Sequence, residues 1–195
     1  AVQAHFARTG IQASIEPAPR APYYQRIRYR LPEPRPHVTI IIPTRDRVDH
    51  LSRCVGSVVS RSTYGAFDVV IVDNSSSEPE TDAYFEQVQQ DSRMSVLRID
   101  EPFNFSRINN LAAARARGTL LCFLNNDTEV ISADWLEEMV SLAVREGVGA
   151  VGAMLYYPSN TMQHAGVVLG LGGIASHAHR GQRRGMPGNY GPAAL

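Results

Sequence analysis

The chain has 195 residues, of which 44% are hydrophobic and 19% are charged, and its formal net charge is zero. This length indicates one large domain, or a domain with a tail, and this composition supplies enough apolar side chains for a globular core. All 19 cationic residues are Arg. The lack of Lys excludes from this chain a P-loop, a Schiff-base lysine for pyridoxal chemistry and the strand lysine of a protein kinase.

The charges are unevenly distributed. Residues 37–175 carry ten Arg against seventeen Asp and Glu, a balance of minus seven, whereas residues 1–36 and 176–195 are rich in Arg. An acidic middle argues against a nucleic-acid partner and suits a site that binds a cation. Cys54 and Cys122 lie within apolar patterns, so we expect reduced core thiols in a cytoplasmic protein. The longest apolar run is too short to form a transmembrane segment.

The two ends differ in composition from the middle. Residues 1–36 hold six of the twelve Pro, a density that blocks a continuous helix or a central strand, so we expect a Pro- and Arg-rich leader or linker. Eleven of the fifteen Gly lie between positions 147 and 191. Residues 176–195 contain no apolar run that could dock securely, and we expect them to be mobile.

A regular alternation of strand and helix patterns begins after residue 37. The β-branched run at 38–42 predicts a strand buried on both faces, and apolar spacings of three and four predict an amphipathic helix at about 48–60. Further strands are predicted at 67–72, 96–99, 119–124 and 148–155, and further helices at about 79–89, 106–117 and 132–143. Strand–helix–strand units in succession indicate an α/β fold with a mostly parallel sheet.

Polar residues follow four of the predicted strands, at the edge where open α/β sheets bind ligands. They occupy positions 43–47, 73–75, 100–104 and 125–127. A single polar loop is expected on any protein surface. Acids and amides that recur at the ends of neighbouring strands favour a ligand-binding site. The first loop reads P-T-R-D-R rather than G-x-G-x-x-G, so the charge of a phosphate ligand would be met by Arg and by Mg2+ or Mn2+ held on carboxylates.

Several segments in this order resemble glycosyltransferase family 2, and more narrowly the bacterial rhamnosyltransferase-like enzymes of O-antigen and cell-wall polysaccharide assembly. The resemblance covers roughly residues 37–184. Its main segments are V-T-I-I-I-P-T-R-D-R at 38–47, V-V-I-V-D-N-S-S-S at 69–77 and F-N-F-S-R-I-N-N-L-A-A-A-R-A-R-G-T-L-L-C-F-L-N-N-D-T-E-V at 103–130. The likeness continues through W-L-E-E-M-V at 135–140, G-A-V-G-A at 149–153 and Q-H-A-G-V-V-L-G at 163–170.

The resemblance implies a GT-A fold. In it, residues 37–175 would form a Rossmann-like, mostly parallel sheet with helices on both faces that holds a nucleoside-diphosphate sugar. Residues 176–195 would be the start of a truncated acceptor-binding half, so we expect the chain, which opens with Ala1, to be a piece of a longer enzyme. The implied place of action is cytoplasmic, with peripheral contact at the inner face of the membrane.

The resemblance also implies nucleotide-binding residues. The loop of Pro43, Thr44 and Arg45 would line the nucleotide, and Asp73, with Asn74 beside it, would hydrogen-bond the base. The alternative for Asp73 is an Asx-turn or a helix cap.

Pyrophosphate and sugar contacts are implied farther along the chain. Arg107 and Asn110 occupy the region of the family's Arg-Asn pair, and a pyrophosphate contact would fall to Arg107. Asn125 and Asn126 would lie at the donor sugar. Because Asn replaces the first acid of the D-x-D motif, Asp127 is left as the metal ligand.

Three histidines are candidate metal ligands, and the catalytic base has no candidate. His164, His177 and His179 invite a zinc site, but no Cys or acid lies among the last 49 residues to complete one. The alternatives are a Gly-rich surface loop or a loop near the donor or acceptor. The resemblance implies that the catalytic base is an Asp downstream of the Q-H-A-G segment, and Glu146 is the last acid of this chain. No catalytic base is therefore assigned, and we expect the chain alone to bind donor without efficient transfer.

The leading hypothesis is therefore an inverting glycosyltransferase that moves a sugar from a nucleoside-diphosphate sugar to a saccharide or lipid-linked saccharide. Two other hypotheses stay open at this point. One is a nucleotide-sugar-binding module without turnover, and the other is a metal-dependent α/β hydrolase.

Overall fold

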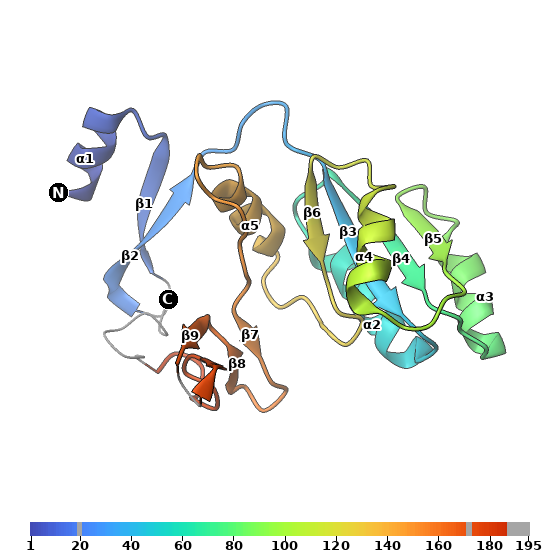
Figure 1. Ribbon diagram of the computed structural model, residues 1–195. Helices are drawn as coiled ribbons and strands as arrows, with labels where there is room; N and C mark the ends of the chain where they lie inside the picture. The colour runs from blue at the N-terminus through green and yellow to red at the C-terminus, as the bar shows by residue number, and fades with distance from the viewer. Residues whose placement is uncertain (19–20, 171–172, 187–195) are drawn as a thin grey trace. The chain divides into compact units, whose positions relative to one another are not determined.

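The computed structural model describes residues 1–18, 21–170 and 173–186, and the chain divides into two compact units. One unit is Pro32–Val140, and the other combines Ala1–Leu31 with Ser141–Leu195 (Figure 1). The domain limits expected from the sequence, at residues 36 and 175, stay predictions.

The unit Pro32–Val140 is built on a four-stranded parallel sheet with the strand order β5-β4-β3-β6 (Figure 1). Its strands are β3 (Val38–Thr44), β4 (Phe67–Asp73), β5 (Met94–Arg98) and β6 (Leu120–Phe123). β3 is central and its Ile40, Ile41 and Ile42 are fully buried. The continuous β-branched pattern thus forms a strand covered on both faces, as a parallel sheet requires.

Helices cover both faces of this sheet. They are α2 (Val48–Arg61), α3 (Pro79–Val88) and α4 (Phe105–Ala113). A further helix, α5 (Trp135–Ala143), follows β6 in the chain and spans the boundary between the two units. α4 lies in front of the sheet in Figure 1, and its Ile108 joins Ile41 and Val70 in one buried cluster. Ile40 and Ile42 alternate with Ile41 and face the other side, where α2 and α3 lie (Figure 1). The predicted α/β fold with a mostly parallel sheet and helices on both faces is confirmed.

The strand predicted at 148–155 is wrong. Residues 148–154 have no regular structure, and only Leu155–Tyr156 forms a short strand, β7, which pairs with β8 (Met162–His164). Gly149 and Gly152 interrupt the apolar run, and glycine supplies no side chain to pack against a sheet. The helix predicted to reach residue 117 likewise ends at Ala113.

Residues 1–36 hold more regular structure than a leader or linker implies. They contain α1 (Val2–Thr9) and a two-stranded antiparallel sheet of β1 (Ala13–Ala18) and β2 (Ala21–Tyr29). Pro17 and Pro22 are tolerated inside these strands because both strands of a two-stranded sheet are edges.

Residues 176–186, the described part of the segment that was expected to be mobile, form hydrogen bonds with other residues of the chain. β9 (Val167–Leu169) pairs with β10 (Ala175–His177), and Gln182 accepts a backbone hydrogen bond from Met162 at 2.7 Å. Residues 187–195, the rest of the segment expected to be mobile, lie outside the described residues. Among the residues that are described, no helix has the length and apolarity to cross a membrane.

Candidate functional site

Three strand ends meet along the carboxyl edge of the sheet. Thr44 and Asp73 are register partners at the last positions of β3 and β4, and both side chains are buried. β6 runs beside β3, and Leu124 just beyond it still donates its N–H to the carbonyl of Ile41 at 2.9 Å. The loop 125–127 therefore leaves the sheet beside the β3 end. The sequence predicted this edge as the site, and the structure brings its polar residues together there.

A hydrogen-bonded chain connects the β6 loop to the β3 loop. Asn126 donates from Nδ2 to Thr44 Oγ1 at 2.9 Å, and the Thr44 hydroxyl donates to the backbone carbonyl of Asp46 at 3.2 Å. The Asn126 amide is thus oriented before any ligand arrives. Asn125 is exposed, and its backbone carbonyl accepts a hydrogen bond of 2.7 Å from the Thr128 hydroxyl that closes the turn.

Asp46 in turn connects the β3 loop to the loop after β4. Its N–H donates to Ser76 Oγ at 2.7 Å, and its Oδ1 accepts from the N–H groups of Ser77 and Glu78 at 2.8 and 2.9 Å. These backbone donors, Glu78 first, hold the pKa of the Asp46 carboxyl below its ordinary value. The sequence did not predict this contact between Asp46 and the loop after β4. Its one signal is the polar, turn-forming composition of both loops.

Asp73 forms an Asx-turn, which was the alternative to base binding that the sequence left open. Its Oδ1 accepts the N–H of Ser76 at 3.0 Å, while Ser75 takes a left-handed φ of 61°. A side chain that is 2% exposed and hydrogen-bonded in this way fixes the loop that it begins. The turn and a base-binding role are compatible, because a carboxylate oxygen accepts more than one hydrogen bond.

Asn74 is engaged within the protein. Its Nδ2 donates to the carbonyls of Ile99 and Glu101 at 3.0 and 2.8 Å, and its N–H donates to the Thr44 carbonyl at 2.9 Å. The side chain is 2% exposed. Both amide hydrogens are therefore used to hold the β5–α4 loop against β4, and the nucleotide contact predicted for Asn74 stays a prediction.

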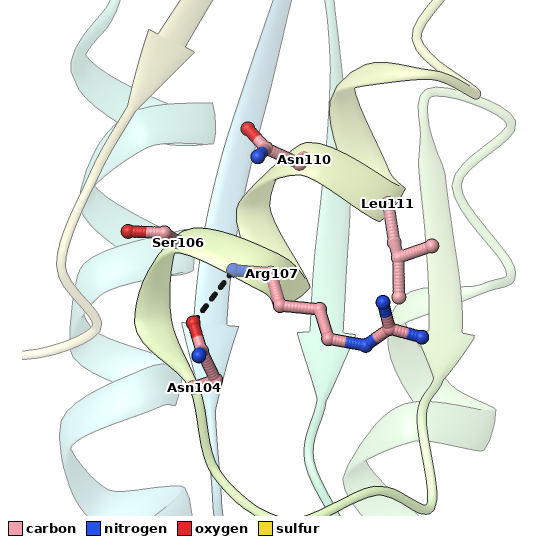
Figure 2. Close-up of a pocket in the computed structure, with 5 residues that line it drawn as sticks. All are labelled: Asn104, Ser106, Arg107, Asn110 and Leu111. Atoms are coloured by element: carbon pink, nitrogen blue, oxygen red, sulfur yellow. Dashed lines mark hydrogen bonds between the residues drawn. The ribbon is translucent and has the colours of Figure 1, made fainter.

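A shallow pocket of about 390 Å³ lies over the first turns of α4 (Figure 2). Asn110 and Ser106 lie on one side of the helix in Figure 2, and Arg107 extends to the other. The Arg107 guanidinium is paired with Glu101, and this pairing raises the pKa of Arg107 and lowers that of Glu101. Arg107 and Asn110 thus line one pocket, and Arg107 would have to leave Glu101 to meet a phosphate. The pocket is also lined by Asn104 and Leu111.

The other predicted residues of the sheet edge are accessible. Pro43 is half-buried at the end of β3, Arg45 is exposed, and Asp127 is exposed two residues after Asn125. Described residues contain no group of three or more His, Cys, Asp or Glu side chains placed to hold a metal ion. One exposed carboxylate fits a Mg2+ or Mn2+ ion that takes its remaining ligands from phosphate and water, as these ions do. Asp127 fits such an ion and does not form a closed protein cage.

Beneath the Asp127 loop lies a buried thiol. Cys54 Sγ lies 3.5 Å from the carbonyl of Asn125 and 3.7 Å from Thr128 Oγ1. Burial raises the pKa of Cys54 to about 11 and that of Cys122 to about 12. Both cysteines are free and buried, as predicted.

Two of the three histidines contact each other. His164 Nδ1 lies 2.8 Å from His177 Nδ1, with the rings edge-to-face, whereas His179 follows at a left-handed φ of 57°. Two imidazoles without a third protein ligand among the described residues do not make a closed zinc site.

Polar residues thus gather at the carboxyl edge of a parallel sheet, which is the edge where open α/β sheets bind their ligands. A model of the family described as "Glycosyl transferase family 2" matches residues 39–185. The chain belongs to this family.

The relatives are longer than this chain. An uncharacterized protein of Sinorhizobium fredii, y4gI, is 48% identical over 181 residues, which are 92% of this chain and 20% of that protein. The O-antigen biosynthesis protein RfbC of Myxococcus xanthus is 47% identical over 177 residues, 91% of this chain and 14% of RfbC. This chain therefore spans a fifth or less of each.

A solved structure shares the fold. The mannosyltransferase PcManGT of Pyrobaculum calidifontis matches with a TM-score of 0.54 and 20% identity, over 60% of this chain and 34% of that one. The described sheet and its helices are thus of the GT-A type.

Proposed function

We propose that this chain is the donor-binding part of an inverting glycosyltransferase that moves a sugar from a nucleoside-diphosphate sugar to a saccharide or lipid-linked saccharide. The observation that carries the proposal is the junction at the sheet edge, where Thr44 bonds Asn126 and lies opposite Asp73. Ligands of open α/β sheets bind at this edge, and the family to which the chain belongs transfers sugars.

Within this proposal the nucleotide lies on the β3 and β4 ends. Pro43, Thr44 and Arg45 line it, and Asp73 hydrogen-bonds the base or ribose. Asn74 acts indirectly by holding the loop that carries Glu101.

The pyrophosphate and the sugar lie toward α4 and the β6 loop. Arg107 exchanges Glu101 for a phosphate oxygen, and Asn110 lines the same pocket. Asn125 and Asn126 contact the donor sugar. Asp127 holds Mg2+ or Mn2+, and the bound cation stabilises the charge of the departing diphosphate.

The relatives support the substrate classes. PcManGT has been solved in complex with GDP-Man and Mn2+, which supports a nucleotide-sugar donor and a divalent cation here. RfbC takes part in O-antigen biosynthesis, which supports a saccharide or lipid-linked acceptor. Two free, buried cysteines fit a reducing compartment, so we place the reaction in the cytoplasm, at the inner face of the membrane where a lipid-linked acceptor is used.

The catalytic base is left unassigned. An inverting displacement needs a base close to the acceptor hydroxyl, and no Asp or Glu follows Glu146 in the sequence. We therefore propose that this chain alone binds donor and transfers sugar slowly.

The test is a two-stage assay of the 195-residue chain. Calorimetry with UDP, dTDP and GDP, with Mn2+ or with chelator, identifies the nucleotide, and incubation of the matching nucleotide sugars with saccharide acceptors follows the products. Nucleotide binding with slow transfer supports the proposal. Release of free sugar without an acceptor would favour a hydrolase, and binding with no product from any donor and acceptor pair would favour a binding module. The absence of nucleotide binding would refute both the donor-binding function and the binding module.

A further inference from the structure

Asp46 occupies a costly backbone position between β3 and α2. It has a left-handed φ of 51°, and Arg47 after it has a φ of 55°. Non-glycine residues keep this conformation only where surrounding contacts hold it, and such residues cluster at functional sites. The contacts that hold Asp46 come from a different loop, about thirty residues away in the sequence.

These contacts place the Asp46 carboxylate at the beginning of α3. Glu78, the N-cap residue of α3, makes no side-chain cap hydrogen bond, and Pro79 occupies the first helical turn. Asp46 Oδ1 instead accepts the N–H groups of Ser77 and Glu78, at 2.8 and 2.9 Å. A carboxylate at a helix N-terminus is favoured both by these donors and by the helix dipole.

The same residue joins both halves of the proposed donor site. Toward β4, the Asp46 N–H bonds the Ser76 hydroxyl at 2.7 Å, and Ser76 donates its own N–H to Asp73. Toward β6, the Asp46 carbonyl accepts from Thr44, whose hydroxyl accepts from Asn126. A continuous series of hydrogen bonds therefore runs from the base-binding acid to the sugar-binding amide through this one residue.

We propose that Asp46 is a positioning residue that sets the distance between the base-binding loop and the sugar-binding loop of the donor site, an inference that rests on the function proposed above. The Asp46 N–H and the carboxylate oxygen Oδ1 both bond the β4–α3 loop, so these two groups act on the loop rather than on a ligand. Removal of the Asp46 side chain frees the two loops to move independently, so a ligand must order them on binding and loses affinity.

The experiment compares four proteins by calorimetry with UDP, dTDP and GDP. In Asp46→Ala the affinity of the nucleotide that binds the unsubstituted chain should fall by about tenfold or more. Asp46→Asn keeps an oxygen for the two N–H groups and should stay within about threefold of the unsubstituted chain. Asp49→Ala is the matched control, because Asp49 is a neighbouring acid whose partners Arg47, His50 and Arg53 lie on or next to α2, and it should bind normally.

Hydrogen exchange separates positioning from loss of fold. Amides of Ser77 and Glu78 should lose protection in Asp46→Ala, whereas the buried amides of Ile40–Ile42 should keep theirs. If Asp46→Ala does not fold, Ser76→Ala removes only the acceptor of the Asp46 N–H, so the Asp46 amide should lose protection and nucleotide binding should weaken.

The outcomes are distinct. Normal nucleotide affinity in Asp46→Ala, or in Ser76→Ala when the first variant does not fold, overturns this inference and leaves the proposed function standing. Equal losses of affinity in Asp46→Ala and Asp49→Ala also overturn it. If the unsubstituted chain binds no nucleotide, the proposed function and this inference fall together.

Discussion

Thr44 and Asp73 lie opposite each other at the ends of β3 and β4, and both side chains are almost completely buried, at 5% and 2% exposure. The two loops that leave these positions therefore start at the same level of the sheet. Their backbones stay joined for one more residue, since the Asn74 N–H donates to the Thr44 carbonyl at 2.9 Å. A ligand at this edge would meet a hydroxyl and a carboxylate together.

Asp73 should contribute to nucleotide affinity and also to the stability of its loop. Asp73→Ala removes a charge-assisted hydrogen bond to the ligand, so binding should weaken by about 1.5–3 kcal/mol. The strengthening of binding by Mn2+ should survive, because Asp73 is not the predicted metal ligand. Asp73→Asn keeps an oxygen for the Ser76 N–H and isolates the ligand effect from the loop effect. A loss of the metal effect in these variants would reverse the roles assigned to Asp73 and Asp127.

Asp127 should carry the metal dependence of nucleotide binding. Calorimetric affinity for the bound nucleoside diphosphate should increase on addition of Mg2+ or Mn2+, and Asp127→Ala should abolish the increase without lowering the melting temperature, because Asp127 is exposed. Glu129→Ala is a suitable control, since Glu129 is a nearby exposed acid that is paired with Arg61 at 2.8 Å. Equal affinity in metal and in chelator for the unsubstituted chain would contradict the assignment.

The sheet was predictable because local sequence and tertiary structure agree there. The β-branched run at 38–42 and the apolar run at 67–72 have the pattern of buried parallel strands, and they became β3 and β4. The run at 148–155 is as apolar but contains Gly149 and Gly152, and counting apolar residues overestimated its tendency to form a strand.

The predicted site residues came from their positions after the strands and from the family resemblance. Such reasoning predicts that Thr44 and Asp127 lie at the carboxyl edge of the sheet, but it does not predict contacts between loops. Asp46 bonds residues about thirty positions away, and Asn74 bonds Ile99 and Glu101. These loops become neighbours because the strands before them are adjacent in the sheet. The periodicity of a single segment does not show which strands are adjacent.

Asn74 should matter for stability more than for chemistry. Asn74→Ala leaves the buried carbonyl of Ile99 without its side-chain donor, which should lower the free energy of unfolding by about 1–3 kcal/mol. Urea denaturation followed by circular dichroism measures this loss. Asn110→Ala, on an exposed position of α4, should change stability by about 0.5 kcal/mol or less. A neutral Asn74→Ala variant would show that this amide does not hold the β5–α4 loop.

The two thiols should be unreactive in the folded protein. Burial raises the pKa of Cys54 to about 11 and that of Cys122 to about 12, so neither forms the nucleophilic thiolate at pH 8. Titration with a disulfide reagent at pH 8 should release no chromophore from native protein and two equivalents after denaturation. Rapid labelling of Cys54 under native conditions would mean that the Asp127 loop above it opens readily.

Acid should release the contact between Asp46 and the start of α3. The pKa of Asp46 is lower in the folded chain than its ordinary value of 3.8, because the N–H groups of Glu78 and Ser77 favour the carboxylate. A lowered folded-state pKa means that this contribution to stability is complete above about pH 4 and is lost as the pH falls through the folded-state value. Asp46→Asn cannot titrate, so its free energy of unfolding should decline less steeply below pH 4 than that of the unsubstituted chain. Urea denaturation from pH 7 to pH 2.5 measures both slopes, and parallel slopes would show that the carboxylate of Asp46 contributes nothing to the acid sensitivity of the fold.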